Sequence, residues 1–218
     1  MLKPRFNAGF FIGKNMTTTP MPALDKAVYL VFGIVLLVLS LGHEMLNPWL
    51  HFSSEKILAG EYWRAFSGHM AHLNLQHGLM NVLGFWACCY FFSDVYRLRH
   101  FFVWWLVGTP LLSACMLLFD GPIGYYVGLS GLLYGWLMFA ILAGFRSQPR
   151  LHLLGFVVLA ARVTWEQTAQ YDTAYLMDTV GGIVYVNAHF YGVLIGAAMA
   201  AFVLCFHALA TDEHNGST

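Results

Sequence analysis

Charged residues are scarce in this chain: Asp, Glu, Lys and Arg together make up 10% of its 218 residues. A typical soluble domain carries roughly 25%. The scarcity of charge, together with 59% hydrophobic residues, therefore excludes an ordinary soluble protein and indicates an integral membrane protein. Acidic and basic side chains balance to a net charge of zero. This balance argues against nucleic acid as a partner, because proteins that bind nucleic acid carry a basic surface.

Cysteine is also scarce, and its positions exclude two kinds of site. The four cysteines (Cys88, Cys89, Cys115 and Cys205) lie inside apolar runs, where a thiol behaves as a small hydrophobe. We therefore expect no extracellular disulfide, and no Cys spacing matches a metal site. The first apolar run is too long for a signal peptide and lacks an Ala-x-Ala site, so no cleavable signal is expected.

Apolar runs dominate the rest of the chain. Six of them occur, at residues 27–45, 73–92, 101–119, 127–145, 151–167 and 183–207. Each approaches the ~20 residues that a helix needs to cross a bilayer. The pattern predicts an all-α membrane protein with six transmembrane helices in one domain at 27–208. A polar segment at 1–26 and a short tail at 209–218 flank this domain. Residues 46–72 are predicted to form an interfacial loop.

The basic residues predict the orientation of these spans. With the N-terminus in the cytoplasm, the outer segments hold only Lys56 and Arg64. The inner segments then hold Lys3, Arg5, Lys14, Lys26, Arg97, Arg99, Arg146 and Arg150. Cytoplasmic segments are enriched in Lys and Arg, so both termini are expected in the cytoplasm. The second, fourth and sixth spans then run from outside inward.

Polar residues inside spans are costly, so they are candidates for function. His77 and Asn81 lie one turn apart near the outer end of the second span, and Ser130 and Tyr134 do the same in the fourth. His189 lies near the outer end of the sixth span. Three inward-running spans thus place these side chains at similar depth in the membrane.

This set suits a serine nucleophile with a histidine base, because a serine hydroxyl needs a neighbouring base to take its proton. We expect Ser130 to be the nucleophile and His189 the base. Small residues on both helices would let the two backbones approach closely. The glycines on which this packing depends are Gly131, Gly135, Gly192 and Gly196.

The supporting groups follow from the same arrangement. His77 and Asn81 could donate hydrogen bonds to a developing oxyanion, beside the backbone N–H of Ser130. We expect no Asp or Glu beside His189, since none is near it in the sequence. We therefore expect the imidazole to be oriented by Tyr134, which could stack on it from one turn below Ser130.

These motifs resemble those of the rhomboid intramembrane serine proteases. The matching residues are Gly128-Leu-Ser130-Gly131 with Tyr134, Ala188-His189-x-x-Gly192-x-x-x-Gly196, His77-x-x-x-Asn81, and Trp63-Arg64 in the first loop. The resemblance covers about residues 27–207. It implies a six-helix bundle without a cofactor, in which Ser130 is the nucleophile, His189 the base, and His77 and Asn81 oxyanion contributors. Gly128 belongs to the nucleophile motif.

Within this family the chain looks most like the rhombosortase branch. The similar features are the absence of an extra domain, the His69-x-x-His72-Leu-Asn run, Trp165-Glu166-Gln167, and the Val184–Gly192 approach to the base. This resemblance implies a bacterial inner-membrane enzyme with its active site toward the periplasm. The implied substrates are membrane-anchored proteins that carry a C-terminal Gly-Gly motif, an apolar span and a basic tail.

Other interpretations of the same residues remain open. The chain could be a general rhomboid protease with other single-span substrates, or a rhomboid-like protein that binds membrane clients without cutting them. A transporter would show paired broken helices in two repeated halves, and no such repeat is visible.

His69, His72 and His77 lack a well-placed acidic partner, so no metal is expected. Arg162 and Glu166 have i, i+4 spacing and are expected to form a structural pair, with contact to a substrate tail as the lesser alternative.

Overall fold

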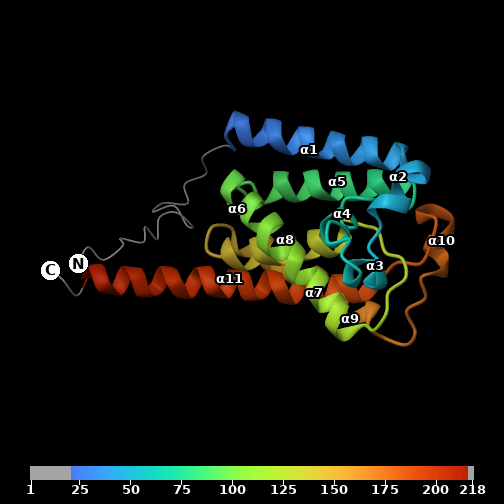
Figure 1. Ribbon diagram of the computed structural model, residues 1–218. Coiled ribbons are helices and arrows are strands. Elements are labelled where there is room, and N and C mark those ends of the chain that lie inside the picture. The colour runs from blue at the N-terminus through green and yellow to red at the C-terminus, as the bar shows by residue number, and fades with distance from the viewer. Residues whose placement is uncertain (1–20, 216–218) are drawn as a thin grey trace.

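The computed structural model describes residues 21–215, and helices account for nearly all of its regular structure (Figure 1). Lys3, Arg5 and Lys14 of the predicted cytoplasmic segment, and residues 216–218 of the predicted tail, lie outside the described residues. The elements in chain order are α1 (Ala23–Leu41), α2 (His43–Leu50), α3 (Ser54–Leu58), α4 (Arg64–Ser67), α5 (Leu75–Phe91), α6 (Leu98–Val103), the π-helical segment η2 (Trp104–Gly108), α7 (Thr109–Phe119), α8 (Ser130–Ala143), α9 (Pro149–Glu166), α10 (Ala174–Val180) and α11 (Val186–Asn215).

Within the described residues, three helical stretches are long and apolar enough to cross a membrane by length and composition. They are Ala23–Leu41, Leu98–Phe119 and Val186–Phe206, and α8 is a shorter apolar helix. The chain is therefore an integral membrane protein with helical spans. The prediction of six spans needs α5, α8 and α9 as well. Of these, α5 has 17 residues and α8 has 14, while α9 contains Arg150, Arg162 and Glu166.

Several helix ends differ from the predicted runs. The first span ends at Leu41 rather than at residue 45, because Gly42 follows it and a second helix, α2, begins at His43. The fourth run was expected from residue 127, but α8 begins only at Ser130. The φ of +149° at Gly128 explains this delay, because it lies outside the helical region. The predicted interfacial loop at 46–72 contains the short helices α3 and α4.

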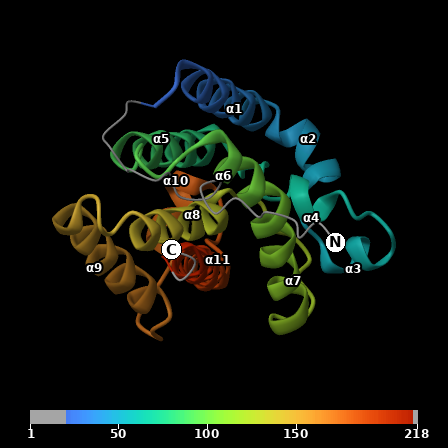
Figure 2. The ribbon, with the colours of Figure 1, turned by 90° about the vertical axis from the view of Figure 1, so that its left-hand side faces the viewer.

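Helix α8 is the central element of the bundle. Viewed along the helices, α5 lies above it, α9 and α7 lie on either side, and α11 lies beneath it (Figure 2). Its contacts with α5, α7, α9 and α11 agree with this view. Burial on all sides explains why the sequence of α8 is apolar around its whole circumference.

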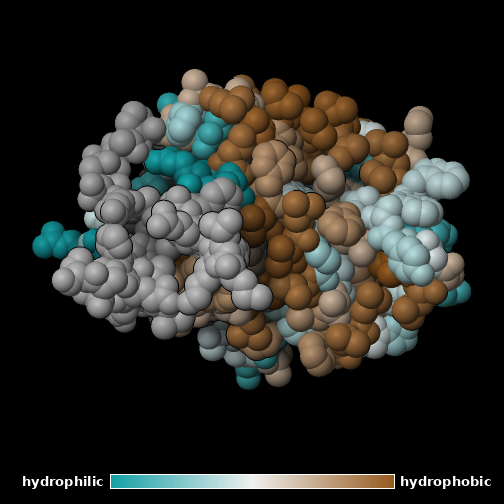
Figure 3. Space-filling view, turned by 60° about the vertical axis from the view of Figure 1, so that its left-hand side comes forward, coloured by the Kyte–Doolittle hydropathy of each residue, from teal (hydrophilic) through white to brown (hydrophobic). Residues whose placement is uncertain are grey.

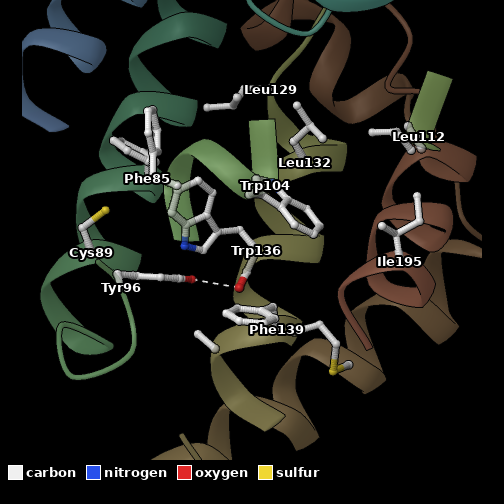
Figure 4. Close-up of a cluster of buried hydrophobic side chains, with 14 of the residues drawn as sticks. Phe85, Cys89, Tyr96, Trp104, Leu112, Leu129, Leu132, Trp136, Phe139 and Ile195 are labelled. Carbon is white, nitrogen blue, oxygen red and sulfur yellow. Dashed lines mark hydrogen bonds between the residues drawn. The ribbon is translucent and has the colours of Figure 1, made fainter. Parts of the chain in front are cut away.

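An aromatic core fills the middle of the bundle (Figure 4). Trp136 of α8 packs against Phe85 of α5, with ring centroids 5.9 Å apart, and against Tyr96, at 5.0 Å. The hydroxyl of Tyr96 donates a hydrogen bond of 3.0 Å to the carbonyl oxygen of Trp136. These contacts hold α8 against α5 and so set the position of Ser130 at its beginning.

The loop before α5 fixes the segment that leads into α8. Phe52 and Tyr126 form an antiparallel bridge, with N–H to O distances of 2.9 and 3.0 Å. The backbone N–H of Gly128 donates to the carbonyl oxygen of Gly68 at 3.0 Å. The buried guanidinium of Arg64 supports this loop by donating to the backbone oxygens of His51 and Pro48.

Hydrophobic side chains cover the middle of the face seen in Figure 3, and more polar ones gather toward its right-hand end. On α1 the exposed large hydrophobic residues include Leu30, Val31, Ile34 and Val38. A soluble protein rarely exposes so continuous an apolar surface. The surface is that expected of a protein whose outer residues contact lipid.

Candidate active site

Ser130 is the first residue of α8, and the chain approaches it through a tightly held turn. The hydroxyl of Tyr126 donates to the carbonyl oxygen of Gly128 at 2.8 Å. The φ of +149° at Gly128 lies in the region that favours glycine. The serine hydroxyl is thus presented on a constrained backbone rather than on a mobile loop.

Helices α8 and α11 pack through the predicted glycines. A Cβ atom at Gly192 would overlap the carbonyl oxygen of Gly131, and one at Gly196 would overlap that of Gly135. A Cβ atom at Gly131 would lie 2.9 Å from the carbonyl oxygen of Ala188. The two backbones are therefore in direct contact, and only glycine permits so close an approach at these positions.

This close approach brings Ser130 and His189 together. Nε2 of His189 lies 2.8 Å from Oγ of Ser130, within hydrogen-bond distance. His189 is 4% exposed, so the contact is largely shielded from its surroundings. A hydroxyl bonded to an imidazole in this way can transfer its proton as the oxygen attacks an electrophile.

Tyr134 stacks on the imidazole of His189. Their ring centroids are 4.1 Å apart and their planes differ by 13°. The stacking restrains the tilt of the imidazole, although it leaves rotation within the ring plane free.

A carboxylate also contacts His189, and the expectation that none lies beside it is wrong. Oε2 of Glu166 lies 2.8 Å from Nδ1 of His189. Glu166 ends α9, which is a different helix and 23 residues away in sequence. Sequence spacing cannot reveal a contact between two helices. The only signal available was a glutamate at the same end of a span as the serine and the histidines.

The expected pairing of Arg162 with Glu166 is present. Nε of Arg162 lies 2.8 Å from Oε1 of Glu166. The hydroxyl of Tyr134 donates to the same carboxylate oxygen at 3.3 Å. Both oxygens of the buried carboxylate therefore have partners, as a buried charge requires.

His77 lies beside the serine, whereas Asn81 faces its own helix. A Cβ atom at Gly128 would be 3.3 Å from Cε1 of His77 and 3.8 Å from Oγ of Ser130, so the three residues surround one small space. Nδ1 of His77 accepts from the backbone N–H of Leu73 at 3.4 Å. The side-chain amide of Asn81 donates to the carbonyl oxygen of His77 at 3.3 Å.

The other conspicuous histidines have separate structural partners. Nδ1 of His72 pairs with Oγ of Ser40 at 3.1 Å, and Nε2 of His69 pairs with Oγ of Ser113 at 2.9 Å. Burial lowers the pKa of His69 and that of His72 to about 3, so both rings are neutral at physiological pH. Within residues 21–215, no three His, Cys, Asp or Glu side chains are grouped for metal binding.

A family model described as "Rhomboid domain" matches residues 59–206. The match covers more than half of the chain and begins just after α3. It contains Ser130, Glu166 and His189, together with α8, α9 and most of α11.

Proposed function

This chain belongs to the rhomboid family of intramembrane serine proteases, and we propose that it is an active serine endopeptidase in which Ser130 is the nucleophile and His189 the general base. The distance of 2.8 Å between Nε2 of His189 and Oγ of Ser130 is the observation that carries this proposal. A rhomboid-like protein that only bound membrane clients would have no use for such a pair. We therefore favour the enzyme over the non-proteolytic alternative.

The proposed reaction follows from the two side chains. Oγ of Ser130 attacks the scissile carbonyl carbon while its proton passes to Nε2 of His189. The tetrahedral intermediate collapses as His189 returns this proton to the leaving amine, which leaves an ester between Ser130 and the substrate. Water, activated by the same imidazole, then hydrolyses the ester and regenerates the serine.

The oxyanion formed in these steps needs hydrogen-bond donors. Ser130 begins α8, and the first N–H groups of a helix have no partner within it and favour negative charge. We propose that the backbone N–H of Ser130 and the imidazole of His77 donate to the oxyanion. Asn81 then contributes through the position of His77, because its amide donates to the backbone of that residue.

Substituting the oxyanion residues should lower turnover by unequal amounts. One lost donor costs on the order of 10²–10³-fold in kcat in related chemistry, and we expect a loss in this range for His77→Ala. Asn81→Ala should cost less, because its side chain acts through His77. The measurement is kcat on a purified membrane substrate. Undiminished kcat in the double variant would remove both residues from the proposed oxyanion site.

We propose that α5, α8 and α9 also cross the membrane, which completes a six-helix domain at 27–208 with both termini in the cytoplasm. At about 1.5 Å per residue, α8 is only about 21 Å long, shorter than the ~30 Å hydrocarbon core. If its C-terminal end meets the inner interface, Ser130 lies below the outer surface of the bilayer.

The ends of the helices support this orientation. The side chain of Ser147, which follows α8, donates to that of Asp94, which follows α5. The backbone N–H of Leu98 donates to the side chain of Asp25 near the start of α1. These contacts bring Lys26, Arg97, Arg99, Arg146 and Arg150 to one end of the bundle. We place that end in the cytoplasm and Ser130 toward the periplasm of a bacterial inner membrane.

The depth of Ser130 restricts the substrate to a membrane-anchored protein. A scissile segment must leave its helix and become extended before its carbonyl can meet the serine hydroxyl. Glycine disfavours a helix by about 1 kcal/mol relative to alanine, so a Gly-Gly pair at the outer end of a span would unwind readily. We propose that the enzyme removes C-terminal anchors made of such a pair, an apolar span and a basic tail, as the resemblance to rhombosortases implies.

A pair of reporters tests this substrate preference. One carries a C-terminal Gly-Gly, apolar span and basic tail, and the control has Leu-Leu in place of Gly-Gly. We expect the Gly-Gly reporter to be released and the control to be cut at least ~10-fold more slowly, because about 2 kcal/mol of helix propensity separates the two. Immunoblotting of the released and anchored forms measures the ratio.

Two outcomes would contradict the anchor proposal. Equal cleavage of both reporters, or cleavage only of a protein with an N-terminal anchor, would indicate a general rhomboid protease. Cells that express the Ser130→Ala variant provide the control for cleavage by other proteases.

A further inference from the structure

Glu166 is a buried carboxylate with three polar side-chain partners. Its side chain is 0% exposed, although carboxylates are almost never fully buried unless paired. One oxygen, Oε1, accepts from Arg162 at 2.8 Å and from Tyr134 at 3.3 Å. The other, Oε2, lies 2.8 Å from Nδ1 of His189. The carboxylate therefore joins the end of α9 to both helices of the proposed active site.

A purely structural ion pair does not explain this arrangement. Arg162 is 37% exposed, so it could meet a glutamate near the surface without burying one. Burying a carboxylate is costly, and a buried ion pair is weak evidence for stability. The burial has a different consequence, since it directs Oε2 to the imidazole nitrogen that does not face Ser130.

The geometry determines which ring nitrogen of His189 carries the proton. A carboxylate paired with arginine is ionised and can only accept hydrogen bonds. Nδ1 must therefore donate to Oε2, which leaves Nε2 as the unprotonated nitrogen that faces the serine hydroxyl. This is the tautomer that general-base catalysis requires.

We propose that Glu166 is a positioning residue that completes a Ser130–His189–Glu166 triad. This inference rests on the proposed serine mechanism. Glu166 fixes the rotation of the imidazole within its plane, and the stacked ring of Tyr134 fixes its tilt. When Nε2 takes the proton of Ser130, the carboxylate stabilises the imidazolium, and it does so again when Nε2 takes a proton from the water that hydrolyses the ester. Glu166 itself keeps its charge throughout.

Arg162 holds the carboxylate through Oε1, the oxygen that does not contact His189. Its guanidinium bonds to Oε1 of Glu166, donates to the hydroxyl of Tyr171 at 2.7 Å, and lies 5.1 Å from the centre of that ring. The carboxylate therefore cannot rotate toward Arg162 without losing one of its partners. Arg162 supports Glu166 through these contacts.

The test compares Glu166→Gln with the wild type in detergent or liposomes, using the anchored Gly-Gly reporter. The amide of Gln can donate to Nδ1 and so favour the wrong tautomer, and it cannot stabilise an imidazolium. In a serine protease the corresponding carboxylate-to-amide change lowers kcat about 10⁴-fold. We expect a fall of at least ~100-fold in kcat with KM changed by less than about threefold, because the interaction matters only in the transition state.

Two further variants separate positioning from folding. Glu166→Asp keeps the charge and should retain more of kcat than Glu166→Gln. The double variant Arg162→Gln, Glu166→Gln removes both charges, so the positive charge of Arg162 does not remain without the carboxylate of Glu166. Its kcat should remain as low as that of Glu166→Gln, while its thermal denaturation midpoint should stay near that of the wild type.

The outcomes distinguish this proposal from the one on which it rests. If Glu166→Gln retains kcat within about threefold of the wild type while Ser130→Ala is inactive, the triad is wrong and the serine mechanism stands. Recovery of kcat in the double variant would attribute the loss to the charge of Arg162 without its carboxylate partner and would equally overturn the triad. Full activity of Ser130→Ala would overturn both proposals.

Discussion

Replacing Ser130 with alanine should reduce cleavage of the anchored reporter to the uncatalysed background. The hydroxyl provides the only nucleophile in the proposed reaction, and His189→Ala should have nearly the same effect because the serine then has no base. In a soluble serine protease, loss of either residue lowers kcat by about 10⁶-fold. Here we expect a fall of at least ~10⁴-fold, which lies below detection for a slow membrane enzyme.

The two effects should not add, because nucleophile and base act as one unit. The Ser130→Ala, His189→Ala double variant should therefore be no less active than either single variant. Labelling by a fluorophosphonate provides an independent measurement, since the wild type should react and Ser130→Ala should not. Both variants should still purify as folded membrane proteins. Cleavage by purified Ser130→Ala at the wild-type rate would show that the serine mechanism is wrong.

A single methyl group at Gly192 should disable the enzyme without touching a catalytic group. The added Cβ would overlap the carbonyl oxygen of Gly131, and this neighbour is backbone that cannot change rotamer. Helices α8 and α11 would have to separate, which should destabilise the fold by about 2–3 kcal/mol. Separation also lengthens the contact between Ser130 and His189, and a misplacement of about 1 Å costs on the order of 100-fold in rate.

Gly155→Ala is the matched control for Gly192→Ala. Gly155 also lies within a helix, α9, but the nearest neighbours of an added Cβ would be side-chain atoms, of Ile141 at 3.3 Å and of Phe92 at 3.5 Å. This variant should keep full activity and gain up to about 1 kcal/mol from helix propensity. Thermal denaturation in detergent and kcat on the reporter measure both variants. Equal behaviour of the two would mean that close contact between α8 and α11 is not required.

Composition and local spacing determine much of this protein without any structure. Scarce charge and long apolar runs require a membrane protein, because the hydrocarbon core tolerates few unpaired charges. Glycines recur at four-residue spacing after Ser130 and after His189. This spacing predicts two helices that each have a face without side chains, so that their backbones can pack closely. A serine motif and a histidine motif at corresponding ends of those helices then predict a Ser–His pair. These features depend on overall composition and on motifs whose residues lie within one or two turns of one another.

Tertiary structure alone decides which helices are neighbours and which atoms meet. Periodicity shows which residues share a helix face, but it does not show what that face contacts. The sequence therefore predicted Glu166 only as the partner of Arg162 on the same helix. The contact between its second oxygen and His189 is seen only in the folded bundle, where α9 lies beside α8 and α11. The start of α8 at Ser130 was hidden as well, because the segment that leads into it is held by Gly68 of the loop before α5. A contact between helices depends on their distance and rotation in the packed bundle, and the packing of the whole chain sets both quantities.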